Sequence, residues 1–93
     1  MENAIYDKWA EILRTIGHPI RIRIIESLLE DDKCVSNIWG SLGLSQATVS
    51  QHLSLLRTRG IVRNCRYGTK VKYSVIDRRI EEIINLIKKG EFT

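Results

Sequence analysis

Two helical segments joined by a glycine-containing turn are the feature that most restricts how this chain can fold. Ser36 is in position to cap a short helix, which Gly43 can end because glycine adopts the left-handed backbone found after helices. Ser45 is in position to cap a second helix, which extends to Gly60. A helix, a tight turn and a second helix within residues 36–59 predict a helix-turn-helix.

The outward face of the second helix has an unusual composition. Val49, Leu53 and Leu56 repeat at helical spacing and predict its buried stripe. The other positions are short, polar and uncharged, whereas a solvated helix face normally carries Glu and Lys. Hydroxyl and amide groups match the donors and acceptors of base edges, so this face favours DNA readout over an ordinary solvated surface. Its members are Gln46, Ala47, Thr48, Ser50, Gln51 and Ser54.

A basic hairpin is predicted directly after this helix. Residues 61–66 and 71–75 alternate apolar and polar side chains, as strands do, and residues 67–70 join them. Residues 37–56 contain no Lys, Arg, Asp or Glu, whereas residues 57–79 contain eight basic side chains and one acidic one. Such an imbalance favours a polyanionic partner. A basic hairpin after a recognition helix is the wing of a winged helix, so we assign residues 61–76 to a wing that grips phosphates.

The first and last helices predict a dimer interface. Residues 3–16 form an amphipathic helix, and residues 78–90 form another, capped by Asp77, while Pro19 opens a helix between them. Together the two terminal helices offer more apolar surface than a small core needs, which usually marks an interface. The alternative is that both pack on their own core. The side chains assigned to the interface are Ile5, Trp9, Ile12, Ile80, Ile83, Ile84 and Ile87.

The length and composition predict one small domain, residues 1–93, that is mainly α-helical. The chain is 43% hydrophobic and has no apolar run long enough to span a bilayer. Its first four residues lack the basic and apolar regions of a signal peptide, so we expect a cytoplasmic protein without a membrane partner. Two cysteines are too few for a disulfide scaffold.

Three stretches resemble the ArsR/SmtB family of winged-helix repressors. Residues 16–24 are similar to the family's opening signature, a hydrophobic and a small residue followed by His/Asp-Pro-x-Arg. Residues 34–38 resemble its Cys-Val-Cys-Asp-Leu box, with serine in place of the second cysteine. Residues 44–53 are similar to the recognition-helix pattern Ser-x-x-x-x-Ser-x-His-Leu, and Leu-x-x-x-Gly-Ile-Val follows at residues 56–62.

The resemblance implies a homodimer with five helices and a wing, which binds a near-palindromic operator and represses transcription until an inducer releases it. In matching positions, it implies DNA contacts from Gln46, Ser50, Gln51 and His52 on the helix and from Arg66 and Lys70 on the wing. For His52, a hydrogen bond to a helix or loop backbone is an equal alternative. The full predicted set is Ser45, Gln46, Thr48, Ser50, Gln51, His52, Arg57, Arg63, Arg66, Lys70 and Lys72.

The sensing sites of the family are not preserved in this sequence. The metal site on the last helix corresponds to Asp77-Arg78-Arg79, where the imidazole ligands are absent and the arginines repel a cation. The cysteine box keeps only Cys34, and a single thiolate is a poor soft-metal ligand set. Cys34 and Cys65 could form a thiol sensor, but the usual strand order separates them by about 10 Å, beyond the 7 Å that a disulfide allows. We therefore predict no metal and no cofactor, and the sequence names no inducer.

Two other classes of function compete with DNA-binding regulation. A winged helix can serve as a protein–protein interaction module, but such an interface would favour aromatic residues and Met over the short polar side chains seen here. An enzyme is excluded because the sequence lacks a nucleophile–base set, paired carboxylates and a phosphate loop.

Overall fold

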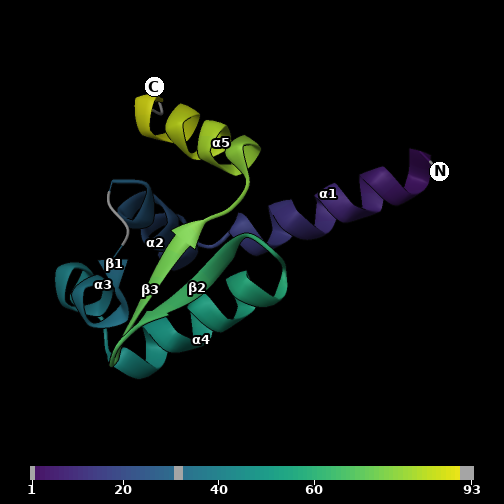
Figure 1. The fold of residues 1–93 in the computed structure, drawn as a ribbon. Helices are drawn as coiled ribbons and strands as arrows, with labels where there is room; N and C mark the ends of the chain where they lie inside the picture. Colours follow the sequence, from purple (N-terminus) through teal and green to yellow (C-terminus); the bar gives the residue numbers. More distant parts are fainter. Residues whose placement is uncertain (1, 31–32, 91–93) are drawn as a thin grey trace.

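The computed structural model describes residues 2–30 and 33–90, and shows five helices and a small sheet among them (Figure 1). The elements follow the predicted order, which confirms a mainly α-helical winged helix-turn-helix. They are α1 (Glu2–Ile16), α2 (Pro19–Glu30), β1 (Lys33–Cys34), α3 (Val35–Leu42), α4 (Gln46–Thr58), β2 (Val62–Tyr67), β3 (Lys70–Val75) and α5 (Arg78–Lys89).

The turn between α3 and α4 ends one helix and begins the next within three residues. Gly43 has a φ of +68°, and the backbone N–H of Leu44 donates to the carbonyl of Trp39 over 3.0 Å, which closes a Schellman motif. Ser45 then caps α4 as predicted. Ser36 does not cap α3, because that helix begins at Val35, so this prediction was wrong by two positions.

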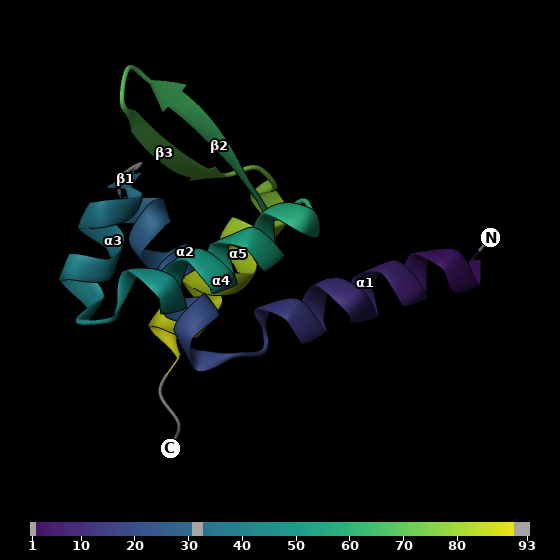
Figure 2. The same ribbon diagram turned by 90° about the horizontal axis from the view of Figure 1, so that it is seen from below.

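The sheet has the strand order β1-β3-β2, and each neighbouring pair is antiparallel. The hairpin turn is shorter than the sequence suggested, because Tyr67 and Lys70 pair with each other and leave only two residues between the strands. The second view shows the hairpin standing away from the helices, as a wing does (Figure 2).

The core lies where α2, α3, α4 and α5 meet the base of the hairpin. Val49, Leu53 and Leu56 of α4 are fully buried there, which confirms the predicted stripe. The other members are Ile16, Ile24, Ile25, Leu28, Ile38, Ile61, Val62, Ile80 and Ile84.

The last helix divides its apolar stripe between the core and the surface. Ile80 and Ile84 are 1% and 0% exposed and lie in the core of this chain, so they are not available to a partner and their assignment to a dimer interface was wrong. Ile83 is half-buried and Ile87 is 44% exposed. The N-terminal part of α1 reaches away from the other helices (Figures 1 and 2), and Ile5 on it is 60% exposed.

Candidate nucleic-acid interface

Helix α4 presents an exposed polar face opposite its buried stripe. Successive residues of a helix are about 100° apart, so Gln46, Ser50, Gln51, Ser54 and Arg57 share one side. All five are exposed. We call these residues the α4 outer face. It contains four short polar side chains and, in the last turn, a single cation.

Ser45 and Thr48 are joined by two hydrogen bonds at the start of α4. The Ser45 hydroxyl oxygen accepts a hydrogen bond from the backbone N–H of Thr48 over 3.2 Å, and its proton is donated to Thr48 Oγ1 over 2.8 Å. Both were predicted as DNA contacts, and the structure gives Ser45 the role of helix cap. The remaining N–H groups of the first turn point out of the helix, where an anion such as a phosphate is favoured.

His52 does not lie on the α4 outer face. Its Nδ1 accepts a hydrogen bond from Arg21 Nε over 3.1 Å, and its ring contacts that of His18, with 4.7 Å between centroids. Burial, and then the charges of His18 and Arg21, lower the pKa of His52 below its usual 6.5. The structure therefore places His52 against α2, bonded to a side chain. This side-chain hydrogen bond differs from the predicted backbone hydrogen bond, while the predicted DNA contact of His52 stays a prediction.

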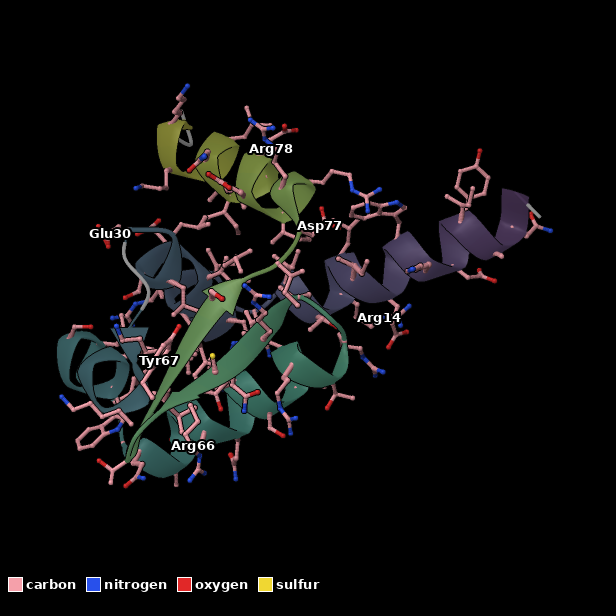
Figure 3. All side chains as sticks on the ribbon, in the orientation of Figure 1. Arg14, Glu30, Arg66, Tyr67, Asp77 and Arg78 are labelled. Atoms are coloured by element: carbon pink, nitrogen blue, oxygen red, sulfur yellow. The ribbon has the colours of Figure 1, made fainter. Side chains whose placement is uncertain are left out.

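The cations of the wing divide between the two faces of the hairpin. Residues directly opposite on antiparallel strands point to the same side, and Val62, which is buried, defines the inner side. Arg63, Lys70 and Lys72 lie on the outer side, whereas Arg66 lies on the inner side and is exposed near the tip (Figure 3). The wing thus carries positive charge on both faces.

An aromatic ring accompanies these cations near the tip of the wing. Tyr67 is 60% exposed, and the ammonium nitrogen of Lys72 lies 5.4 Å from the centre of its ring. Tyr67 was not among the side chains predicted from the sequence, although its place in the predicted turn beside Lys70 was a signal.

Besides the apolar packing of α1 on the core, three interactions of charged side chains among the described residues join α1 to other helices, and sequence reasoning identified none of them. Arg59 Nη2 pairs with Glu11 Oε1 over 2.7 Å, where α4 ends. The Arg79 guanidinium lies 4.8 Å from the centre of the Trp9 ring. Its hydrogen bonds to Asp77, the cap of α5, also hold the pKa of that carboxyl below its usual range. The third contact is a hydrogen bond from Arg21 Nη1 to the carbonyl of Thr15 over 2.8 Å. The first two contacts join residues far apart in sequence, and the third crosses the turn between α1 and α2, so helical periodicity does not indicate any of them.

The two cysteines lie on the two outer strands of the sheet. Cys34 on β1 and Cys65 on β2 are both opposite Lys72 of the central strand, so two strand spacings, about 10 Å, separate their backbones. This is the order expected from the sequence, and it exceeds the reach of a disulfide. Cys65 is an exposed free thiol; the Cys34 side chain lies outside the described part of the structure.

The described residues contain neither a cluster of metal ligands nor a membrane-spanning helix. No three His, Cys, Asp or Glu side chains within that part of the chain gather closely enough to hold a metal ion. None of the helices seen there is long and apolar enough to cross a membrane.

Comparison with known proteins shows the same architecture in a family of regulators. The model of the arsR family of bacterial regulatory proteins matches residues 18–64. An uncharacterised helix-turn-helix transcriptional regulator of Methanocaldococcus jannaschii is 40% identical, over 88% of this chain and 93% of its own length. The transcriptional repressor PagR of Bacillus anthracis is 39% identical over 84% of this chain and 79% of its own length.

Solved structures of regulators share the fold of this chain. The crystal structure of PagR superposes with a TM-score of 0.84 at 34% identity, covering 91% of this chain and 98% of PagR. The homodimeric winged helix-turn-helix DNA-binding domain of a possible ArsR-family regulator from Mycobacterium bovis has a TM-score of 0.85. It is 23% identical, covers 94% of this chain and 81% of that domain, and thus shares the fold. The chain belongs to the arsR family and is a DNA-binding transcriptional regulator, not an enzyme.

Proposed function

We propose that this protein represses transcription as a homodimer, with one α4 helix from each protomer in the major groove of a near-palindromic operator. The observation that carries this proposal is the α4 outer face, an exposed and nearly uncharged helix surface beside a basic wing. Gln46, Ser50 and Gln51 read base edges, while Arg57 and the wing bind phosphates. The wing residues in this role are Arg63, Arg66, Lys70 and Lys72.

The exposed apolar side chains of the terminal helices support the dimer. On α1, Ile5, Tyr6 and Leu13 are 60%, 69% and 51% exposed, and on α5 Leu86 is 70% exposed. A helix that reaches away from its own core with such side chains gains free energy when a second copy covers it. The homodimeric domain from Mycobacterium bovis shares this fold. The proposed interface keeps Ile5, Trp9, Ile12, Ile83 and Ile87 and adds Tyr6, Leu13 and Leu86.

The location of the protein follows from its partner. A regulator that binds operator DNA acts where the chromosome is, and we place it in the bacterial or archaeal cytoplasm on that ground.

Selection of bound DNA from a random pool, followed by binding titrations, tests this function. Gln51→Ala is expected to relax base preference at one position per half-site, at a cost of about 1–3 kcal/mol against the selected base. Lys70→Ala is expected to weaken binding to all sequences evenly and to reduce the slope of the salt dependence by about 0.9 for each phosphate that is no longer neutralised. Lys88→Ala, which removes the same charge from the end of α5, is the control and leaves both properties unchanged.

The main competing function is a protein–protein interaction module without DNA readout. In that case the selection yields no consensus sequence. The unaltered protein then binds DNA weakly, and Gln51→Ala and Lys70→Ala bind it with the same weak affinity. Either result overturns the proposed function.

A further inference from the structure

The structure brings both histidines of the chain into contact at the junction of three helices. The imidazole rings of His18 and His52 are 4.7 Å apart and inclined at 47°. His18 lies directly before α2, where its Nδ1 accepts a hydrogen bond from the backbone N–H of Ile20 over 3.1 Å. His52 lies in the middle of α4, between the exposed Gln51 and the buried Leu53. His52 is therefore the direct sequence neighbour of Gln51, a residue of the α4 outer face.

Arg21 links this junction to α1. Its Nε donates to His52 Nδ1 over 3.1 Å, and its Nη1 donates to the carbonyl of Thr15, in the last turn of α1, over 2.8 Å. One planar guanidinium thus fixes the middle of α4 relative to the end of α1. The ion pair between Arg59 and Glu11 joins the same two helices where α4 ends.

The bond between Arg21 and His52 exists in only one protonation state of the imidazole. A guanidinium donates hydrogen bonds and cannot accept them, so His52 Nδ1 must carry no proton. Protonation would place a donor against a donor and put two cations within 3.1 Å. Burial, His18 and Arg21 already lower the pKa of His52, which is the direction expected of an imidazole held in its neutral form.

The surrounding charges do not compensate an imidazolium. The neighbours of His52 on this side are Arg21 of α2 and His18, which directly precedes that helix. The groove beside them is lined by Glu11 and Arg14 from α1 and by Arg59 from α4. Glu11 is the one carboxylate in that lining, and it is paired with Arg14 over 3.0 Å and with Arg59 over 2.7 Å.

We propose that Arg21 and His52 are positioning residues that hold α4 at its DNA-binding angle relative to α1, and that protonation of His52 releases this hold and weakens operator binding. The proposal rests on the proposed function, in which α4 reads DNA and α1 belongs to the dimer interface. Because α1 joins the protomers, the angle of α4 to α1 sets the spacing of the two reading helices. Acid then weakens DNA binding, opposite to the usual effect of charging a histidine near phosphates.

The test is the pH dependence of binding to the selected operator between pH 7.5 and 5.5, with the fold monitored by circular dichroism at each pH. For the unaltered protein we expect affinity to fall toward the acid end, by up to about tenfold per pH unit for each protomer that must release a proton. His52→Asn places the side-chain carbonyl oxygen of asparagine near the position of Nδ1, and this oxygen does not titrate. We expect this variant to bind normally at pH 7.5 and to lose the acid weakening.

Two further variants separate positioning from simple stability. His52→Leu leaves Arg21 Nε without its acceptor, so we expect weak operator binding at every pH from a folded protein. If His52→Leu does not fold, the His52→Asn profile still decides, because that variant keeps the hydrogen bond. His18→Asn keeps an acceptor at the start of α2 and is expected to retain the acid weakening, which assigns it to His52.

The outcomes distinguish this inference from the proposed function. Acid weakening that persists in His52→Asn, or normal binding by folded His52→Leu, overturns the positioning role. If Gln51→Ala leaves base preference unchanged, the proposed function itself fails. If Gln51→Ala relaxes base preference but the pH profile of the unaltered protein is flat, only the positioning role fails.

Discussion

Removing the Ile5 side chain should weaken the dimer without weakening the fold. Ile5 lies on the part of α1 that reaches away from the core and is 60% exposed in the single chain. Full burial of an isoleucine side chain contributes about 1.5–3 kcal/mol. If the partner chain covers the exposed part of Ile5, truncation to alanine therefore removes about 1 kcal/mol of association free energy per protomer. A two-fold interface contains the residue twice, which gives about 2 kcal/mol, or roughly a 30-fold higher dimer dissociation constant.

Sedimentation equilibrium of Ile5→Ala measures this effect directly. Asp7→Ala, an exposed change on the other side of the same helix, is the matched control and should leave the dimer unchanged. The thermal midpoint of Ile5→Ala, measured for the monomer, should also stay close to that of the unaltered chain, because the core does not contain Ile5. A dimer dissociation constant that changes less than about threefold would refute the reasoning that a second chain covers this face of α1.

Three further predictions concern the cap, the histidine and the cysteines. Ser45→Ala removes the acceptor for the Thr48 N–H and should lower the free energy of unfolding by about 1 kcal/mol, seen as a thermal midpoint about 4–8 °C lower, whereas Ser54→Ala should change little. The lowered pKa of His52 means that the unfolded chain binds more protons just below pH 6.5, so the free energy of unfolding should be highest above that pH and decrease as the pH falls below it. Urea midpoints at pH 7.5 and 5.5 measure the decrease, which should be smaller in His52→Asn; an equal decrease in both proteins would contradict this assignment. Mild oxidation of the folded protein should form no disulfide between Cys34 and Cys65, because two strand spacings separate them, and mass spectrometry showing the loss of two hydrogens from a monomer would contradict the strand order.

Local signals in the sequence predicted most of the helices and their ends. The cap at Ser45, the left-handed glycine at position 43 and the cap at Asp77 each depend on residues within about four positions, which a sequence displays directly. The misplaced start of α3 shows the limit of such signals, since Ser36 has the right chemistry for a cap but lies inside the helix.

Long-range contacts explain what could not be predicted. The periodicity of α5 shows an apolar stripe but does not show what covers it, so Ile80 and Ile84 of the core could not be separated from the more exposed Ile83 and Ile87. Likewise, the direction in which His52 points is determined by Arg21, which is 31 positions away in the sequence. The exposed side of α4 was predicted correctly because helical periodicity alone defines it, and the DNA contacts of its residues stay a prediction.

The most direct test of the central claim is a hydroxyl-radical footprint on the selected operator. If a dimer places two α4 helices in successive major grooves, two symmetric protected half-sites should appear, centred about 10–10.5 base pairs or a multiple of that apart. In Gln51→Ala, base preference should relax at equivalent positions of both half-sites. A single protected site, or protection without symmetry, would contradict the account.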